Sequence, residues 1–469
     1  MAHLDNDTIS AIATPQGRGG IGIVRISGPL TSQIATSICG ELPEPRIATS
    51  AKFKDSNGNV LDEGIALFFP KPNSFTGEDV LELQGHGGLY VLNSLLRCSL
   101  DHGCRIARPG EFTERAFLND KLDLLQAEAV ADLIDANSEQ AMRSALRTLQ
   151  GVFSAHVNAL VEKITAVRIH VEAAIDFSDE DIDVLGDNAV SQSLKETLEL
   201  LYSIVRQATQ GALLQEGIAV VIAGEPNAGK SSLLNALAGT DSAIVTDIAG
   251  TTRDLLKEQL NLDGLPVHVT DTAGLRESND VVELEGVRRA RDAIAKADKI
   301  LLVVDGSKNE MTESTIVKNL RLLVEDIDPD EWFKQNAQRL CLVNNKIDLI
   351  EDAEAGAAST TYQEQILPVF HIAAKHRLGM TDIINWIKTE CGFEAESESA
   401  FIARERHLQA LDAAGELLEK ASSAVSKQSH LELVAEDLRL AQQKLGTITG
   451  EFTADDLLGE IFSSFCIGK

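Results

Sequence analysis

The first part of the chain shows short apolar runs separated by turns. Residues 21–26, 64–69 and 79–83 are three such runs, with glycine or proline close to each. Runs of this length between turn residues are typical of strands, and the longer segments between them have the spacing of helices. We therefore predict an α+β unit over residues 1–118.

Two later stretches have a helical pattern. Residues 119–215 contain almost no proline or glycine, and one helical face carries Leu122, Leu125, Ala129, Leu133 and Ala136. The same pattern returns in residues 389–469, for example over 432–445, and ends in the short tail CIGK.

Between the helical stretches, residues 216–388 alternate apolar runs with helical segments. This alternation predicts a doubly wound α/β domain. Because helical stretches flank it on both sides, we expect one helical domain with the α/β domain inserted into it. Two independent helical units are the alternative. The predicted protein is thus multidomain, with α+β, helical and α/β parts.

Composition and charge narrow the functional class. Hydrophobic residues make up 44% and charged residues 24%, as in ordinary globular chains. No apolar run reaches the about 18 residues of a membrane span, and the N-terminus lacks a signal-peptide pattern. The six cysteines form no CxxC pair, which favours a reduced, cytoplasmic protein without a zinc site. The net charge of −30 disfavours stand-alone binding of nucleic acid, so any RNA contact would need a local basic patch or a partner.

The octet GEPNAGKS at residues 224–231 matches the phosphate-binding pattern G-x-x-x-x-G-K-[ST]. An apolar run precedes it and a helical segment follows, which is the context that the pattern requires. Gly224 and Gly229 would let backbone N–H groups face phosphate oxygens at a helix N-terminus. Lys230 would reach the β- and γ-phosphates, and Ser231 would ligate Mg²⁺. The predicted nucleotide-binding set here also includes Asn227, Ala228 and Ser232.

Three further motifs extend this site. DTAG, which is Asp271, Thr272, Ala273 and Gly274, follows an apolar run and would lie near Mg²⁺ and the γ-phosphate. NKID resembles the NKxD motif of GTPases and contains Asn345, Lys346 and Asp348. Asp348 would accept hydrogen bonds from the N1–H and the 2-amino group of guanine, which adenine lacks, so we predict GTP as the nucleotide. In AAK, at residues 373–375, the Ala374 N–H would contact the guanine carbonyl, and an alanine stands where GTPases usually have serine.

Other motifs run along the whole chain: DTISAIATPQGRGG (7–20), SFTGED (74–79), QGHGG (84–88), RPGEFTERAFLNDK (108–121) and the terminal CIGK. Together with the nucleotide motifs they resemble the MnmE (TrmE) family of tRNA modification GTPases. The resemblance implies an FAD-dependent, MnmG-like partner and the addition of an aminomethyl-type group to carbon 5 of the wobble uridine of certain tRNAs. It also implies tRNA bound mainly through that partner, and a homodimer. Its N-terminal domain would bind 5-formyl-tetrahydrofolate or a related one-carbon folate.

The same resemblance assigns folate contacts to Arg25, Glu82, Lys121 and Lys469. Cations can pair with the glutamate tail of folate, and a carboxylate can accept hydrogen bonds from the pterin ring. Plain surface charges are the alternative for Arg25 and Lys121. Cys466 is either an accessible, reactive thiol or a small apolar anchor. For His86 we favour a hydrogen-bonded turn residue over a functional imidazole.

Hydrolysis needs a substitute for the usual water-orienting glutamine, because Leu275 follows DTAG. Asp254 and Glu283 are the nearest carboxylates, and the resemblance favours Glu283, although it could be one more exposed acid. Arg253 could stabilise developing charge. The family instead uses K⁺ for that purpose. By the resemblance, K⁺ would be held by Asn227, Thr246, Ile248 and Thr251, and some of these residues would also contact GTP. Thr252 matches the threonine that completes Mg²⁺ coordination.

A regulatory or ribosome-assembly GTPase, with no direct role in modification chemistry, is the alternative function. It predicts an attached RNA-binding module. We find neither a KH-type GXXG in a basic context nor a basic arm.

Overall fold

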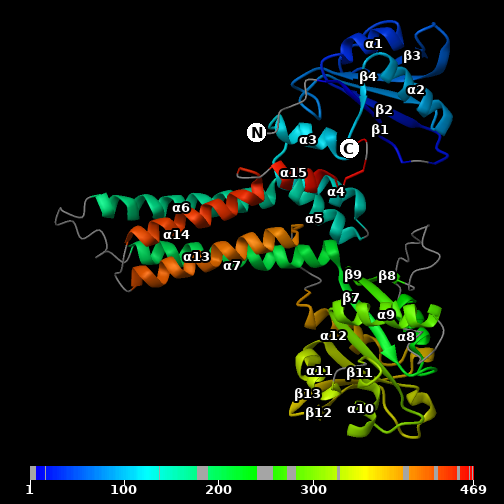
Figure 1. The fold of residues 1–469 in the computed structure, drawn as a ribbon, viewed down its shortest axis with the longest axis vertical. Coiled ribbons are helices and arrows are strands. Elements are labelled where there is room, and N and C mark those ends of the chain that lie inside the picture. Colours follow the sequence, from blue (N-terminus) through cyan, green and yellow to red (C-terminus); the bar gives the residue numbers. More distant parts are fainter. Residues whose placement is uncertain are drawn as a thin grey trace. The chain divides into compact units, whose positions relative to one another are not determined.

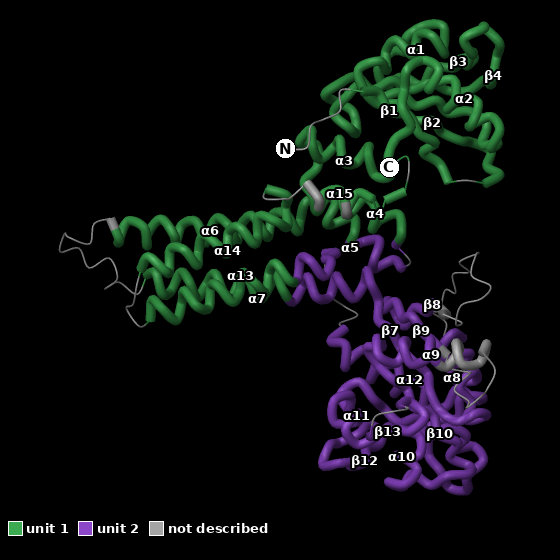
Figure 2. Tube along the Cα trace, viewed as in Figure 1, with its two compact units in different colours: residues 1–135, 145–205, 409–469 green, residues 136–144, 206–408 purple. Residues whose placement is uncertain are grey.

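The computed structural model describes residues 7–15, 17–136, 138–176, 189–239, 257–271, 281–324, 328–393, 401–426, 431–451, 455–463, 465, 466 and 468. These residues form two compact units, which are coloured separately in Figure 2. The first unit contains residues 1–135, 145–205 and 409–469, and the second contains 136–144 and 206–408. Among the described helices none is long and apolar enough to cross a membrane.

The N-terminal part of the first unit is a mixed sheet of the order β3-β4-β5-β2-β1-β6. Its strands are β1 (Ile9–Ile12), β2 (Gly22–Ser27), β3 (Thr49–Lys54), β4 (Val60–Phe69), β5 (Val80–Gly85) and β6 (Arg105–Ile106). Alternating side chains of β2 are buried, as period-2 patterning requires. They share one core with the apolar faces of helices α1 (Thr31–Cys39) and α2 (Leu89–Asp101). The predicted α+β character of this region is confirmed (Figure 1).

The rest of the first unit is helical. Its helices include α3 (Glu111–Leu118), α4 (Leu124–Asp135), α6 (Val152–Asp176), α14 (Leu431–Thr449) and α15 (Asp455–Ser463). Three helices extend across the boundary between the units: α5 (Glu139–Leu149), α7 (Ala189–Glu216) and α13 (Glu405–Ser426). Helices α6 and α14 lie side by side (Figure 1), and Gln442 of α14 donates a hydrogen bond to Thr165 of α6 at 2.5 Å. Tyr202 of α7 likewise donates to Glu419 of α13 at 2.6 Å.

These contacts join helices from before and after the α/β region into one helical domain. The predicted insertion is therefore confirmed, and the alternative of two independent helical units is wrong. One detail of the predicted helical stripe is also wrong, because Leu122 and Ala136 lie outside α4. Helix α4 begins only at Leu124, after the turn that follows α3, and it buries Leu124, Ala127 and Glu128 in addition to the predicted Leu125 and Ala129.

The second unit contains a seven-stranded sheet of the order β12-β13-β11-β10-β7-β9-β8. Its strands are β7 (Ile218–Gly224), β8 (Lys257–Leu262), β9 (Leu265–Asp271), β10 (Lys299–Asp305), β11 (Leu340–Asn345), β12 (Gly356–Tyr362) and β13 (Gln365–Ile372). The five central strands are parallel, and β8 and β12 pair antiparallel at the two edges.

Helices cover both faces of this sheet. One apolar core joins it to α8 (Lys230–Ala238) and α12 (Met380–Glu390). A second core joins the other face to α9 (Val281–Lys296), α10 (Glu313–Leu320) and α11 (Pro329–Asn336). The short 3₁₀ helices η1 (Ala337–Arg339), η2 (Ile347–Leu349) and η3 (Ala374–His376) follow α11, β11 and β13. The predicted doubly wound α/β domain is confirmed, and its motifs stand at strand ends.

Candidate functional site

The nucleotide motifs meet at one edge of the seven-stranded sheet. Strand β7 ends at Gly224, which pairs with Val303 of β10. Asp305, at the end of β10, pairs with Asn345 of β11, and Asn345 pairs with Ile372 of β13. The carboxyl ends of parallel strands form the usual ligand site of such sheets. The register therefore brings GEPNAGKS, NKID and AAK together, as the sequence predicts.

The loop between β7 and α8 has the backbone of a phosphate-binding loop. Gly224 and Gly229 have φ angles of 142° and 100°, which side-chain-bearing residues rarely adopt. A Cβ at Gly224 would lie 2.2 Å from the Val303 carbonyl oxygen, and one at Gly229 would lie 2.1 Å from Asn345 Nδ2. Only glycine therefore fits at both positions, and the loop residues suit close approach of phosphate oxygens.

Lys230 lies at the start of α8 with its side chain buried. Its Nζ donates to the carbonyl oxygens of Gly224 and Glu225 at 2.9 and 3.0 Å. The ammonium group thus lies across the mouth of the loop. Ser231 and Ser232 follow it in the first turn of α8, and both are exposed. This placement agrees with the predicted roles of the lysine and of the serine hydroxyl beside the phosphates.

Asn345 connects the NKID motif to the phosphate loop. Its Nδ2 donates to the Ala228 carbonyl oxygen at 2.9 Å, and its Oδ1 accepts the Ala374 N–H at 3.1 Å. The Ala374 N–H, which we expect to contact the guanine carbonyl, thus donates to a side chain of the protein. Because the Asn345 carboxamide already accepts it, a guanine carbonyl would have to share the same donor.

Lys346 makes a second connection to the loop. It adopts the left-handed conformation, with a φ of 67°, and its Nζ donates to the Asn227 carbonyl oxygen at 2.6 Å. The same Nζ donates to Asp305 Oδ2 at 2.7 Å. Asn345 and Lys346 thus hold two successive carbonyl groups of the loop.

Asp305 is a residue that the sequence analysis missed. Its side chain is only 5% exposed, and its Oδ1 accepts the Ser307 hydroxyl at 2.6 Å. Burial alone would raise the pKa of this carboxyl group, but hydrogen bonds from Lys346 and Ser307 hold the pKa below its usual value. The available signal was an aspartate at the end of an apolar run, followed by Gly-Ser.

Asp348 lies in η2 beside the strand ends, with a side chain that is 24% exposed. Its Oδ2 is 3.5 Å from His376 Nε2 in η3. The carboxylate is therefore accessible to a ligand that approaches from the sheet edge, as recognition of guanine requires.

Several predicted residues lie outside the part of the chain that the structure describes: Thr246, Ile248, Thr251, Thr252, Arg253, Asp254, Thr272, Ala273, Gly274 and Lys469. Asp271 ends β9 opposite Ile222, and Glu283 lies in the first turn of α9, but only their backbone is described. Asn227 is exposed and left-handed, with a φ of 65°. Among these positions the structure thus places Asn227, which is one predicted K⁺ ligand, and the backbone of Asp271 and Glu283.

The predicted folate residues lie in the first unit. Arg25 and Glu82 are neighbours on β2 and β5, with Arg25 Nε and Nη2 at 3.0 and 2.9 Å from Glu82 Oε1. The guanidinium lies 5.9 and 5.7 Å from the ring centroids of Phe75 and Phe112. Arg25 Nη1 also donates to the Gly468 carbonyl oxygen at 3.3 Å. The structure therefore brings the residue before Lys469 to the Arg25–Glu82 pair.

Lys121 is exposed and lies in the turn before α4, close to Gly77. Gly77 is near Phe75 in sequence, so Lys121 belongs to the same region of the domain as Arg25. A half-buried cation–carboxylate pair beside the exposed ring of Phe75 suits a flat ligand with both donors and a negative tail. The residues present thus fit a folate.

The C-terminal tail is anchored through its neighbours and not through the thiol. Phe465 is 6% exposed, whereas Cys466 is exposed. A Cβ at Gly468 would lie 2.5 Å from the Ile12 carbonyl oxygen, so this residue packs closely on β1. The alternative in which Cys466 is a buried apolar anchor is therefore wrong, and its thiol is accessible.

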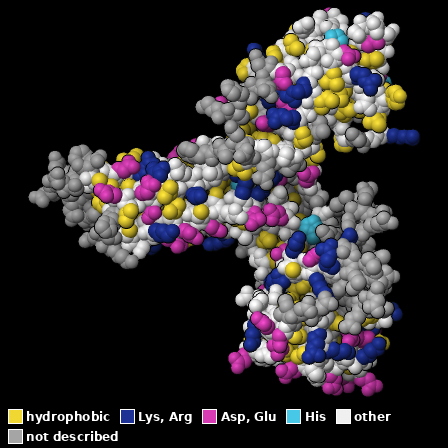
Figure 3. Space-filling model, viewed as in Figure 1, with side chains coloured by type: hydrophobic (Ala, Val, Ile, Leu, Met, Phe, Trp, Pro, Cys, Tyr) yellow, Lys and Arg dark blue, Asp and Glu magenta, His cyan; other side chains and the backbone are white. Residues whose placement is uncertain are grey.

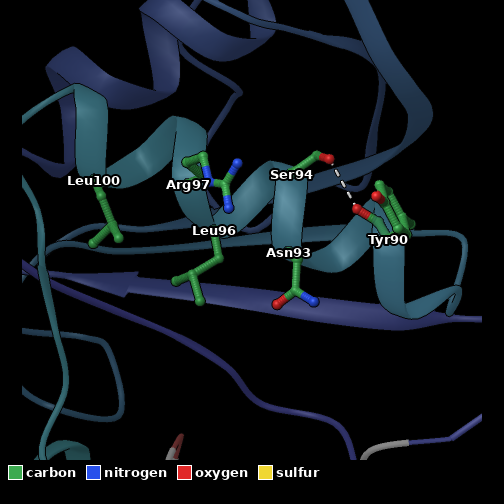
Figure 4. Close-up of a pocket in the computed structure, with 6 residues that line it drawn as sticks. All are labelled: Tyr90, Asn93, Ser94, Leu96, Arg97 and Leu100. Atoms are coloured by element: carbon green, nitrogen blue, oxygen red, sulfur yellow. Dashed lines mark hydrogen bonds between the residues drawn. The ribbon is translucent and has the colours of Figure 1, made fainter.

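His86 is a hydrogen-bonded turn residue, as favoured. Its N–H and Nδ1 lie 2.7 and 2.8 Å from the two carboxylate oxygens of Asp62. Nearby, on the surface of α2, a hollow of about 460 Å³ is lined by Tyr90, Asn93, Ser94, Leu96, Arg97 and Leu100 (Figure 4). Among these six lining residues only Arg97 is charged, so the hollow lacks a pair of groups that could act in catalysis.

On the face of the molecule that Figure 3 shows, the described Lys and Arg side chains form no single basic patch. Lys and Arg are interspersed with Asp and Glu on both units. Charges of both signs on this face reflect the 72 acidic and 42 basic residues of the chain.

The strand–loop–helix with its fixed glycines, together with NKID at the same sheet edge, defines a P-loop GTPase domain. Two family models match the chain: TrmE N-terminus (GTP-binding protein) over residues 8–121 and MnmE helical domain over residues 124–466. Proteins named tRNA modification GTPase MnmE from three strains of Coxiella burnetii are 53% identical to it over 471 aligned positions, with 100% of both chains covered. The chain therefore belongs to the MnmE (TrmE) family of tRNA modification GTPases.

Solved GTPases are also similar to part of the chain. Era from Aquifex aeolicus, bound to GDP and AlF4⁻, is 25% identical and covers 44% of this chain and 66% of its own, with a TM-score of 0.27. The G domain of the FeoB iron transporter of T. maritima is 24% identical, and the match covers 29% of this chain and 77% of that domain, with a TM-score of 0.21. At these TM-scores the similarity adds nothing to the assignment above.

Proposed function

We propose that this member of the family is a K⁺-stimulated GTPase that acts with an FAD-dependent, MnmG-like partner. Together they would add an aminomethyl-type group to carbon 5 of the wobble uridine in certain tRNAs. The observation that carries the proposal is the 53% identity over the whole chain to proteins named tRNA modification GTPase MnmE. The phosphate loop and the NKID motif at one sheet edge support the GTPase part independently.

The described residues suit binding of GTP. Loop N–H groups and Lys230 would hold the phosphates, with Lys230 exchanging its two loop carbonyls for phosphate oxygens. Asp348 would select guanine. Mg²⁺ at Ser231 and Thr252, and K⁺ at Asn227, Thr246, Ile248 and Thr251, would offset the charge that develops during hydrolysis. Glu283 would orient the attacking water, with Asp254 as the second candidate and Arg253 as a further stabiliser of charge.

The N-terminal α+β region would bind a one-carbon folate through Arg25, Glu82, Lys121 and Lys469, and would form the homodimer. Folate would supply the carbon unit of the new group. Support comes from the Arg25–Glu82 pair and from the contact between Arg25 and the tail. The accessible Cys466 thiol beside this region is a further candidate for the chemistry.

We also propose that the chain is divided into segments 1–118, 119–215, 216–388 and 389–469. The protein would act in the cytoplasm. The family models support the first boundary, since one ends at residue 121 and the other begins at 124. tRNA would bind mainly through the partner, which agrees with the interspersed charges of this chain.

The test is complementation of a bacterial strain that lacks its own MnmE. Mass spectrometry of wobble nucleosides should show restored modification with the wild-type chain and none with Lys230→Ala. Lys334→Ala, at an exposed position of α11, is the control and should restore modification fully. Normal GTP hydrolysis without any restored modification would instead favour a regulatory GTPase.

The K⁺ part has its own test. GTP hydrolysis should be clearly faster in K⁺ than in Na⁺ at equal ionic strength, because K⁺ would replace the missing arginine finger. Asn227→Ala should remove this difference. Equal rates of the wild-type enzyme in the two salts would contradict the proposed role of K⁺.

A further inference from the structure

The carboxylate of Asp305 has no role in the function proposed so far, although it lies in the nucleotide-binding edge. It is at the end of β10, where it pairs in register with Asn345. Its donors are the Ser307 hydroxyl at 2.6 Å, the Ser307 N–H at 3.2 Å and Lys346 Nζ at 2.7 Å. Lys308 Nζ is farther away, at 3.8 Å, on a side chain that is 70% exposed. The carboxylate is therefore oriented by short contacts on both oxygens.

The contact with Lys346 continues to the phosphate loop. Lys346 Nζ donates at 2.6 Å to the carbonyl oxygen of Asn227. Both residues have positive φ angles, 67° and 65°, a conformation that residues with side chains adopt rarely, although asparagine adopts it more readily than lysine. Such conformations persist only where surrounding contacts hold them.

A lysine ammonium on a flexible stem does not hold a peptide group by itself. It loses side-chain entropy when it is fixed, and water competes for its protons. A buried carboxylate that accepts from the same ammonium supplies the missing constraint. Asn345 shows the same arrangement, because the Ala374 N–H fixes its carboxamide while it holds the Ala228 carbonyl.

We propose that Asp305 is a positioning residue for the phosphate loop. Its carboxylate holds Lys346 Nζ against the Asn227 carbonyl, so that the guanine-recognition motif and the loop keep one geometry. The consequence for nucleotide binding rests on the GTPase assignment alone. The consequence for K⁺ rests on the proposed function, because Asn227 is the proposed K⁺ ligand.

The test begins with Asp305→Asn, which keeps the shape but turns an amide toward the ammonium. Dissociation of a fluorescent GDP analogue, measured by stopped flow in Na⁺ buffer, should become about tenfold faster or more, since breaking a buried charge pair acts on the dissociation rate. The K⁺ concentration for half-maximal hydrolysis should rise, while kcat at saturating GTP and K⁺ stays within about twofold. Lys308→Ala removes the distant ammonium and should change neither quantity.

A double-mutant cycle shows whether Asp305 acts through Lys346. In a Lys346→Met background, Asp305→Asn should change GDP dissociation by less than about twofold, because the contact is already lost. An effect as large as in the wild-type background would overturn the proposal, and so would an unchanged dissociation rate in Asp305→Asn. If Asp305→Asn alone does not fold, Ser307→Ala removes the hydroxyl that orients the same carboxylate and should also accelerate GDP dissociation, and an unchanged rate in that variant would overturn the proposal.

The two proposals fail in different ways. Equal rates of GTP hydrolysis by the wild-type enzyme in K⁺ and Na⁺ would contradict the proposed function. The rate of GDP dissociation in Na⁺ buffer would still test the role of Asp305. A wild-type enzyme that needs K⁺, combined with an unchanged dissociation rate in Asp305→Asn, contradicts only the role of Asp305.

Discussion

At the level of single residues, the described nucleotide site depends on polar side chains that hold backbone groups. Asn345 and Lys346 each hold a carbonyl group of the phosphate loop, and each is itself fixed by a second contact. Asp348 stands apart, because its carboxylate is partly exposed and free of short contacts with the loop. Two members of NKID thus position the loop, and the third is available for the base.

Asp348→Asn should lower GTP affinity by about tenfold or more, because an amide donor would face the donors of guanine. Xanthosine triphosphate, which has a carbonyl in place of the 2-amino group, should bind more tightly to Asp348→Asn than to the wild type. Competition against a fluorescent GDP analogue measures both effects. His376→Ala changes the neighbour at 3.5 Å and should leave the preference for GTP intact. Retained GTP preference in Asp348→Asn would refute the assigned role.

Acid should destabilise the N-terminal region through Glu111. Burial raises the pKa of this carboxyl group, but hydrogen bonds from Arg105, the Arg108 N–H and Arg115 outweigh burial and lower it. The unfolded state therefore takes up the proton first, and this contribution to stability is present above about pH 4.5 and lost as the pH falls through the folded-state pKa. Melting temperatures between pH 3 and 7 should fall toward acid in the wild type and fall less steeply in Glu111→Gln.

Glu114 provides the matched control for this pH effect. Burial raises its pKa despite the nearby Arg108, so its contribution has the opposite sign. Glu114→Gln should therefore leave the acid-side loss of stability in place. Equal pH profiles for Glu111→Gln and the wild type would show that the Glu111 contacts do not contribute to acid sensitivity.

At the level of elements, the apolar runs predicted some strands of the two sheets, and those at 21–26, 64–69 and 79–83 became β2, β4 and β5. The apolar run that precedes GEPNAGKS became β7, because a fully buried parallel strand is nearly continuous in apolar residues. The stripe from Leu122 to Ala136 was less accurate, since periodicity does not show where a turn delays the start of a helix. The loop before α8 depends on glycine backbone conformations that the GEPNAGKS pattern did reveal.

Gly229→Ala should abolish nucleotide binding and lower stability, because the new Cβ would lie 2.1 Å from Asn345 Nδ2 at a φ of 100°. The matched control is Gly459→Ala in α15, where a Cβ meets nothing within 4 Å. That change should stabilise the helix by about 0.5–1 kcal/mol. Calorimetry and GDP titration measure both variants, and a Gly229→Ala protein with normal GDP affinity would contradict the close packing described here.

At the level of the whole molecule, distant segments complete each site. Arg25 contacts Gly468, which is 443 positions away in sequence, and helices from before and after the α/β domain pack along each other. The C-terminal tail therefore belongs to the N-terminal α+β region, although the P-loop lies between them in sequence.

Deletion of residues 466–469 should leave GTP hydrolysis largely intact but abolish tRNA modification in the complementation assay. The tail packs on β1 and contacts Arg25, and none of its described contacts involves the second unit. Cys466→Ser separates the thiol from the anchoring contacts, and modification lost in both variants would assign the thiol a chemical role. Normal wobble-uridine modification in the truncated protein would remove the tail from the proposed chemistry.

The sequence by itself determined the features whose parts are adjacent along the chain. Phosphate binding uses successive backbone N–H groups, so GEPNAGKS is readable as one octet, and Asp348 is readable from NKID for the same reason. Only the tertiary structure decided how these pieces are held. Lys346 joins Asp305 and Asn227 across 41 and 119 positions, and Arg25 pairs with Glu82 across 57. Such contacts follow from strand order and register, which long-range packing sets and local residue patterns do not encode.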